Sequence, residues 1–418
     1  QLTNIQQQLL DPELKEKENL YKELQAVESR YSDFILELRK KSPQYASTAY
    51  PEPYTLDEAR AQLLDKKTYI VEFFMGEENL FVWVISKDKV LWSKSFPYEQ
   101  KFFEKIADYQ SQIAQHKINL NFQLGKDIYD TLLKDALEQV PVSSHLVIIP
   151  DGLLLRFPFE ALVKDFSGRA PKYLLEYYTI SYAPSASVLG EVKKYQRLGT
   201  TKLLDLLAFG NPLIEEKGEK AKAAVEYLRA GGVQLLPLPY AEEEVSSISK
   251  IYKEKGKTAE TYVKEKALEE VIKSRETSQF KILHLATHGI IDDRVPALSG
   301  LLLAPSVDPR GDDGFLRLNE IFHLKLNTEL VTLSACETAL GKEVRGEGMI
   351  GLTRAFFYAG SRSVMASLWM VSDQSTAILM KDFYSYYIKG EKPSTALRQA
   401  KLKLLKGSDQ LYRHPFFW

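Results

Sequence analysis

The sequence predicts an α/β fold in which a mostly parallel sheet is flanked by helices. From about residue 199 onward, short apolar runs alternate with amphipathic segments, such as Phe280–Ala286 and Asp373–Tyr387. The apolar runs are nearly continuous, as expected of parallel strands that are covered on both faces. Alternation of such strands with helices is typical of a parallel sheet with helices on both sides.

The composition describes a soluble, folded chain of more than one domain. The chain has 418 residues, of which 44% are hydrophobic and 27% are charged, and its formal net charge is -1. A chain of this length is expected to contain two or three domains. The balanced charge does not favour nucleic acid or an anionic membrane as a partner, and no apolar run is long enough to span a bilayer. No signal peptide is visible, and we expect a piece of a longer, cytoplasmic protein.

The cysteine count restricts the chemistry further. The chain has one cysteine, Cys336. An internal disulfide is therefore impossible and a cysteine-rich metal site is excluded. A reducing compartment fits this usage best. We expect no cofactor and no metal.

Three regions are expected along the chain. Residues 1–50 form a polar helical linker or the end of an upstream helical region, because apolar residues recur there at helical spacing. Residues 51–198 form a first block, which opens with a hairpin of Thr68–Phe74 and Leu80–Ile85. A polar helical stretch then runs to about Val140, and two strands follow at Leu146–Pro150 and Thr179–Ala183.

The second block, residues 199–418, carries the alternation of strands and helices. Strands are expected at Leu203–Phe209, Ala259–Val263, Phe280–Ala286, Leu330–Ser334 and Ser363–Trp369. Helices are expected at Ala241–Tyr252, Ala267–Lys273, Met349–Ala359, Asp373–Tyr387 and Thr395–Leu405.

Two chemically active side chains follow two of these strands directly. His288 comes after Phe280–Ala286, and Cys336 comes after Leu330–Ser334. Functional groups of open α/β sheets gather at the carboxyl ends of the strands. A thiolate and an imidazole are the minimum set for nucleophilic acyl transfer. The backbone N–H groups of Gly289 and Cys336 are the candidate donors to a developing oxyanion.

Other interpretations of these residues were weighed. A lone histidine or cysteine is more often structural than catalytic. His284 and His288 resemble a metal-binding pair, but four residues of a strand span about 13 Å, so one ion cannot bridge them. The run from Gly346 to Gly351 matches a dinucleotide-binding pattern, yet about ten residues separate it from the preceding strand. A mobile glycine loop beside the site is the better interpretation of this run.

Several short motifs, taken together and in order, resemble the CHAT domain. They are Ile149–Gly152, Phe157–Leu162, His284–Gly289, Leu333–Thr338, Gly346–Gly348, Tyr358–Gly360 and Ser367–Trp369. CHAT proteins are caspase-like and separase-like cysteine peptidases, often carried behind tetratricopeptide repeats in bacteria. The resemblance covers about residues 50–418 and implies a caspase-like fold with an inactive N-terminal half and an active C-terminal half. It implies that His288 and Cys336 are catalytic.

The resemblance also suggests residues that bind a substrate. Ser334 matches a position that lines the pocket for the residue before the cut, called P1. Ser367 and Trp369 match the strand that pairs with an extended substrate. Met370 stands where caspases carry an arginine, so a preference for aspartate at P1 is not expected. Asp373 either reaches a basic P1 side chain or caps a helix that starts at Gln374.

The sequence therefore predicts a cysteine endopeptidase that cleaves a specific partner protein, bound as an extended strand. The loop containing Gly341, Gly346 and Gly348 is expected to be ordered by an upstream tetratricopeptide region or an activating protein. Two alternatives remain: a catalytically silent interaction module that keeps the fold, and a nucleotide-binding switch built on the glycines.

Overall fold

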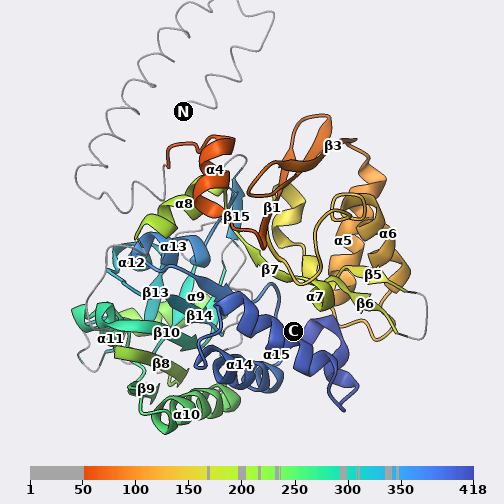
Figure 1. Ribbon diagram of the computed structural model, residues 1–418. Helices are drawn as coiled ribbons and strands as arrows, with labels where there is room; N and C mark the ends of the chain where they lie inside the picture. The colour runs from red at the N-terminus through yellow and green to blue at the C-terminus, as the bar shows by residue number, and fades with distance from the viewer. Residues whose placement is uncertain are drawn as a thin grey trace, which may run out of the picture. The chain divides into compact units, whose positions relative to one another are not determined.

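A computed structural model gives the arrangement of the chain (Figure 1). The residues it describes are 51–418 without 167–169, 196–203, 215–217, 231–234, 236, 292–298, 307, 309–310, 335–340 and 345–347. The chain divides into two units, Gln1–Pro53 and Tyr54–Trp418, and the second unit is described below. The helix predicted over residues 1–50 lies outside the described residues.

The first sheet is mixed. Within the described residues its strand order is β3 (Val90–Pro97), β2 (Asn79–Ile85), β1 (Thr68–Met75), β4 (His145–Ile149) and β7 (Thr179–Tyr182). Strands β1, β4 and β7 run parallel, while β2 and β3 run antiparallel to their neighbours. The predicted hairpin is confirmed, with Met75 paired to Leu80. Strand β3 was not predicted, because its mostly exposed residues give the weak alternation of a sheet edge.

Helices cover both faces of the first sheet. The helices α5 (Gln100–Ala114) and α6 (Phe122–Leu132) share one apolar core with it, and α4 (Leu56–Leu63) and α8 (Ala186–Tyr195) share the other. Helices α5 and α6 confirm part of the predicted helical stretch. The elements between β4 and β7 are short: η1 (Gly152–Arg156), η2 (Phe159–Ala161), β5 (Val163–Asp165), β6 (Lys172–Tyr173) and α7 (Leu174–Tyr177).

The second sheet is parallel throughout, which confirms the predicted fold class. The described strands lie in the order β9 (Ala259–Lys264), β8 (Leu204–Pro212), β10 (Phe280–Ala286), β14 (Leu330–Leu333) and β17 (Val364–Ala366). In sequence, β8 is the first strand of this sheet. Strand β9 is then added on one side of it and β10, β14 and β17 on the other, as in doubly wound sheets. Strand β17 is shorter than the predicted Ser363–Trp369.

Helices also cover both faces of the second sheet. The helices α10 (Pro239–Glu254), α14 (Asp373–Tyr387) and α15 (Pro393–Leu405) pack on one face. The helices α11 (Glu269–Lys273), α12 (Leu318–His323) and α13 (Leu352–Ala359) pack on the other. A further helix, α9, spans Gly218–Ala230. The predicted start of α13 at Met349 is wrong, because Gly348–Gly351 form strand β16.

Two small sheets complete the second block. Strands β11 (Gly289–Ile290), β12 (Gly300–Leu302) and β13 (Phe315–Arg317) form an antiparallel sheet that begins right after His288. Strand β15 (Gly341–Val344) pairs with β16 in an antiparallel ribbon. No helix in the described ranges is both long and apolar enough to cross a membrane.

The C-terminal segment contacts the elements of the first sheet. The Arg398 guanidinium, on α15, donates to the carbonyl oxygens of Leu175 and Glu176 at 2.8 and 2.7 Å. The end of the chain, with η5 (Leu411–Arg413) and η6 (Pro415–Phe417), brings Trp418 into the first core. The two sheets therefore lie in one compact unit, and the division at residues 198 and 199 stays a prediction.

Candidate active site

The candidate site lies at the carboxyl ends of β10 and β14. These neighbouring parallel strands pair Leu285 with Leu333, and the Ser334 N–H donates to the Leu285 carbonyl at 2.9 Å. His288 follows Leu285 by three positions, and Cys336 follows Leu333 by three positions. Cys336 itself lies outside the described residues. The paired strands thus lead directly toward both predicted catalytic residues.

The backbone of His288 is held by β12. The Leu302 N–H donates to the His288 carbonyl at 2.9 Å, and the buried Thr287 hydroxyl donates to the Leu302 carbonyl. His288 is half-buried. The small antiparallel sheet therefore fixes the chain where it leaves β10.

The Gly289 N–H does not take part in the hydrogen bonds between β11 and β12. It is paired with Leu301, and the bond between Leu302 and His288 makes this a non-hydrogen-bonded pair of the antiparallel ladder. In such a pair the N–H points away from the partner strand, here β12. The role of the Gly289 N–H as an oxyanion donor stays a prediction.

The predicted substrate-binding residues differ in their surroundings. Ser334 is half-buried at the end of β14, and Ser367 directly follows β17. Met370 is 65% exposed. Trp369 is 8% exposed, and its indole N–H donates to the Phe416 carbonyl at 3.0 Å. The Trp369 ring therefore packs in the core, and its predicted strand pairing with a substrate, which uses the backbone, stays a prediction.

Asp373 does not cap its own helix with its side chain. Helix α14 begins at Asp373 rather than at Gln374, with Ser372 as its N-cap residue. The half-buried Asp373 carboxylate instead accepts the Tyr240 N–H at 3.0 Å, in the first turn of α10. Burial raises the pKa of Asp373 above its ordinary value. Its predicted contact with a basic P1 side chain is not tested by this geometry.

The predicted glycine loop is in part a ribbon. Gly341 opens β15 and Gly348 opens β16, which pairs with it, while Gly346 lies outside the described residues. Strand β16 contacts η1 of the first block. The predicted regulatory role of these glycines stays a prediction.

A buried polar cluster lies beneath the candidate site. It comprises Glu244 from α10, His284 from β10, Thr332 from β14 and Tyr384 from α14, each at most 1% exposed. His284 Nε2 lies 2.8 Å from Glu244 Oε1, without hydrogen-bond alignment. The Tyr384 hydroxyl lies 2.9 Å from Thr332 Oγ1 and 3.1 Å from His284 Nδ1. His284 is thus a buried residue of the second core.

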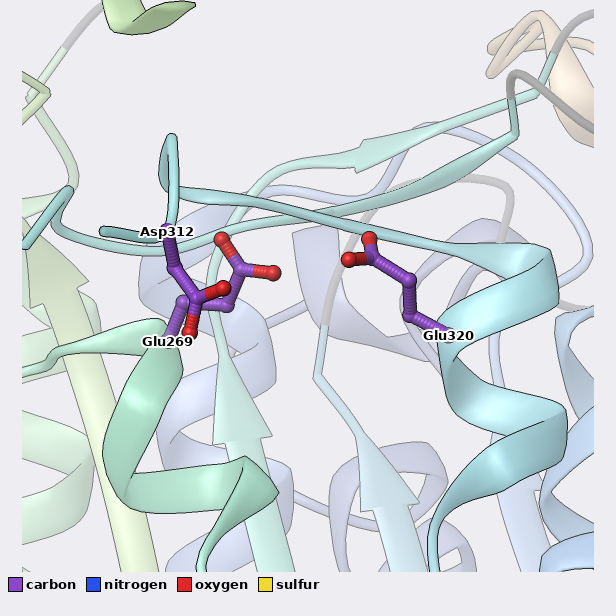
Figure 2. A group of neighbouring side chains, drawn as sticks. All are labelled: Glu269, Asp312 and Glu320. Atoms are coloured by element: carbon purple, nitrogen blue, oxygen red, sulfur yellow. The ribbon is translucent and has the colours of Figure 1, made fainter. Parts of the chain in front are cut away.

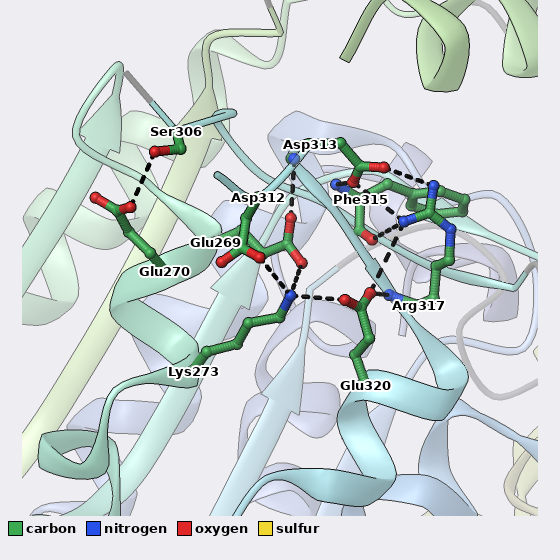
Figure 3. Close-up of polar contacts among 10 residues, drawn as sticks. Glu269, Glu270, Lys273, Ser306, Asp312, Asp313, Phe315, Arg317 and Glu320 are labelled. Atoms are coloured by element: carbon green, nitrogen blue, oxygen red, sulfur yellow. Dashed lines mark hydrogen bonds and ion pairs between the residues drawn. The ribbon is translucent and has the colours of Figure 1, made fainter. Parts of the chain in front are cut away.

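Carboxylates that could hold a cation gather elsewhere in the second block. Glu269, Asp312 and Glu320 converge in Figure 2, with one oxygen from each within 4.8 Å of the others. Figure 3 shows Lys273 reaching into this group. Its Nζ lies 2.5 Å from Glu269, 2.8 Å from Asp312 and 2.6 Å from Glu320. An ammonium group already lies where a metal ion would bind.

This carboxylate group anchors the small sheet that holds His288. A Glu269 carboxylate oxygen accepts the Gly314 N–H at 2.8 Å, just before β13 (Figure 3). Asp313 binds the Arg317 guanidinium through contacts of 3.1 and 2.7 Å. Burial raises the pKa of Glu269 to about 7 in spite of Lys273. The group is therefore best described as a structural clamp on β13.

The sequence did not reveal the partners of His284 or the cation in the acidic group. Glu244 and Tyr384 stand far from His284 along the chain and read as ordinary helix residues. The one local signal was the spacing of Glu269 and Lys273, four residues apart on α11, which favours an ion pair. The remaining contacts depend on how the helices pack.

Comparisons with known proteins place the chain in a family. The CHAT domain family model matches residues 123–418. Tetratricopeptide repeat protein 28 of Mus musculus and of Homo sapiens are each 27% identical over 320 residues, covering 66% of this chain and 12% of the relative. The chain thus spans only a small part of the curated relatives it matches. The Saccharomyces cerevisiae separase–securin complex is a similar solved structure at TM-score 0.40 and 12% identity, covering 100% of this chain and 26% of that chain.

The family model covers well over half of the chain, so the resemblance drawn from the sequence motifs is confirmed. The parallel sheet with helices on both faces fits the caspase-like fold that this family implies. The chain belongs to the CHAT domain family.

Proposed function

We propose that the chain is a cysteine endopeptidase that uses His288 and Cys336 as a catalytic dyad. The observation that carries the proposal is the register of β10 and β14. His288 and Cys336 each follow the Leu285–Leu333 pair by three positions. Neighbouring strands of a sheet lie about 4.8 Å apart, so side chains at equivalent positions past the strand ends are within reach of each other.

The proposed reaction is acyl transfer through a thioester. The Cys336 thiolate attacks the carbonyl carbon of the peptide bond, and the N–H groups of Gly289 and Cys336 stabilise the oxyanion. The His288 imidazolium then protonates the leaving amine as the C–N bond breaks. His288 next takes a proton from water, which hydrolyses the thioester and releases the thiolate. A lone thiol used in this way suits a cytoplasmic, reducing compartment.

The proposed substrate is a protein segment bound in extended form along β17. Strand β17 lies at the edge of the second sheet in the part of the chain that the structure describes. An edge strand offers backbone groups to an added strand. Ser334, Ser367 and the exposed Met370 lie at this end of the sheet and are the proposed contacts for substrate side chains.

An activity-based probe tests the dyad directly. Since Cys336 is the one cysteine of the sequence, an acyloxymethyl-ketone or iodoacetamide probe reports on it alone. We expect labelling of the wild type, none of Cys336→Ala and strongly slowed labelling of His288→Ala. The matched control is His323→Ala, because His323 is an exposed histidine at the end of α12.

A peptide-library cleavage profile then separates the proposal from its alternatives. Cleavage that disappears in Cys336→Ala supports an endopeptidase. Absence of labelling and cleavage under every activating condition would favour a silent interaction module. A nucleotide-dependent rise in melting temperature would favour a nucleotide switch. A preference for Arg or Lys at P1 that survives in Asp373→Ala would exclude Asp373 as its determinant.

Regulation is proposed to act through the β15–β16 ribbon. The ribbon is glycine-rich, follows the Cys336 segment in sequence, and contacts η1 of the first block. An upstream tetratricopeptide region or an activating protein is the proposed trigger. If the isolated chain cleaved substrate at the full rate of the complete protein, this regulation would be wrong.

A further inference from the structure

We infer that Tyr384 is a positioning residue that locks together the two strands carrying the proposed dyad. The inference rests on the proposed function, because it concerns the alignment of His288 with Cys336. It arises from the buried polar cluster of Glu244, His284, Thr332 and Tyr384.

The Tyr384 hydroxyl bridges β10 and β14. It lies 2.9 Å from Thr332 Oγ1 and 3.1 Å from His284 Nδ1. His284 and Thr332 are register partners on adjacent strands. A phenol hydroxyl both donates and accepts, so one oxygen joins the two side chains. The strands are thus connected by a side chain as well as by their backbone ladder.

The bridge lies in line with the proposed dyad. His288 follows His284 by four positions, and Cys336 follows Thr332 by four positions. A relative slip of the two strands would change the offset between His284 and Thr332. The same slip would shift the ends of β10 and β14, after which His288 and Cys336 follow in sequence, by an equal amount.

Among the described strands, the buried polar side chains of this row lie on the two strands that lead to the dyad, while Thr261, at the β9 end of the row, is exposed. On the outer sides, His284 is paired with Ala208 on β8, and Thr332 is paired with Met365 on β17. A core that needed only packing would continue the apolar pattern. Buried polar groups are destabilising unless they are paired, and a paired network fixes one arrangement of its partners.

Glu244 is the polar neighbour of the other ring nitrogen of His284. Its carboxylate lies 2.8 Å from His284 Nε2, without hydrogen-bond alignment, while Tyr384 contacts Nδ1. The contact that joins His284 to β14 is therefore the one through Tyr384. Tyr384 itself is fully buried, with the Phe383 ring 4.8 Å away, so its hydroxyl has little freedom to move.

The test compares two phenol-to-phenyl changes on one helix. Tyr384→Phe removes the bridging hydroxyl and keeps the ring. Tyr387→Phe is the matched control, since Tyr387 lies one turn further along α14 and its hydroxyl donates to the Glu329 carboxylate at 3.5 Å, just before β14. Thr332→Val removes the hydroxyl on β14 that contacts Tyr384. Thr332→Ser keeps a hydroxyl at this position and should keep the contact.

Two readouts are measured on the full chain: amide hydrogen exchange at Ser334, and kcat and KM for peptide cleavage. We expect faster exchange in Tyr384→Phe and Thr332→Val, with kcat lowered on the order of tenfold and KM unchanged, because misplaced reacting groups slow the chemical step. Tyr387→Phe and Thr332→Ser should match the wild type.

The outcomes separate this inference from the proposed function. If the wild type cleaves no peptide, the proposed endopeptidase activity is refuted. Amide hydrogen exchange at Ser334 still tests whether Tyr384 holds β10 and β14 together. Exchange in Tyr384→Phe equal to that in Tyr387→Phe overturns the inference whether or not the wild type cleaves. Faster exchange with unchanged kcat also overturns it, because the lock then has no bearing on the dyad.

Discussion

The two sheets of the chain use the carboxyl ends of their strands differently. In the first sheet, Asp151 follows β4, and its carboxylate accepts the N–H groups of Met75 and Gly152 at 2.8 and 2.9 Å. The Asp151 carboxylate therefore has a structural role, because it binds the backbone at the end of β1. In the second sheet, His288 and the Cys336 segment follow β10 and β14, and the backbone around His288 is fixed by β12.

The cores beneath these ends differ as well. The first core is lined by apolar and aromatic side chains, among them Val71, Phe73 and Leu146. The second core contains Glu244, His284, Thr332 and Tyr384 at its centre. Both sheets are covered by helices on two faces, and they differ in the polar side chains buried beneath them. The polar cluster lies in the half that carries the proposed dyad.

The largest expected effect comes from comparing a substitution after β10 with one after β4. His288→Ala is expected to lower kcat/KM on the order of a thousandfold or more, with little change in stability, because it removes the proposed catalytic imidazole. Asp151→Ala is expected to keep activity and lower the free energy of unfolding by about 1–3 kcal/mol, since two backbone N–H groups lose their acceptor. Peptide cleavage and urea unfolding measure both. Loss of activity in a stable Asp151→Ala would contradict this division.

The second prediction concerns the buried pair in the second core. Glu244→Leu is expected to lower the free energy of unfolding by about 1–3 kcal/mol, because the buried Nε2 of His284 loses its nearby polar neighbour. Adding His284→Leu should recover part of that loss, as expected for two side chains that interact. Urea unfolding of the four members of the cycle measures the coupling. Strict additivity would show that the pair contributes nothing.

The third prediction uses pH to distinguish the halves. The folded-state pKa of Glu269 is about 7, raised by burial, so its stabilising contribution is complete below the unfolded value of 4.5 and is lost as pH rises to 7. The loss is at most about 3 kcal/mol. His145 has the opposite sign: burial lowers its pKa from 6.5 to about 4, so its contribution is lost as pH falls through this window.

These opposite slopes are measured as differences between variants. The difference in unfolding free energy between wild type and Glu269→Gln should change between pH 4.5 and 7, with the wild type losing stability as pH rises. The difference for His145→Gln should change as pH falls from 6.5 to 4. Parallel curves for wild type and variant would contradict the assigned pKa shift.

The smallest expected effect is at Asp373. Asp373→Ala is expected to lower the free energy of unfolding by about 0.5–2 kcal/mol, because α10 loses the acceptor for one N–H of its first turn. Asp373→Asn should retain most of the stability through its amide oxygen. Thermal unfolding of the two variants measures the difference. Equal destabilisation by both would show that the carboxylate charge, rather than the acceptor, matters.

Much of the architecture could be predicted from the sequence. The predicted boundaries of β10 match the structure to the residue, and those of α14, β4, β7, β9 and β14 match to within one or two residues. These elements have strong patterns, since buried parallel strands are continuously apolar and α14 is amphipathic. The sequence does not predict strand β3, which lies at an exposed edge, and it predicts a helix start where β16 lies.

The candidate site could be predicted only as two strand ends. His288 and Cys336 were found from their positions after apolar strands and from the CHAT motifs. The surroundings of Trp369 and Asp373 were not found, since the partners Phe416 and Tyr240 are distant in sequence. Nothing local distinguishes a tryptophan that faces a substrate from one that packs inside.

The sequence by itself determined the family, the parallel sheet and the residue types at its carboxyl edge. These follow from local pattern, because apolar continuity and short motifs are read along the chain. Only the tertiary structure decided which side chains meet. It joined Tyr384 to both His284 and Thr332, and it put Lys273 among three carboxylates. Contacts of this kind depend on helix packing across the sheet, which is set by the whole core rather than by any one segment.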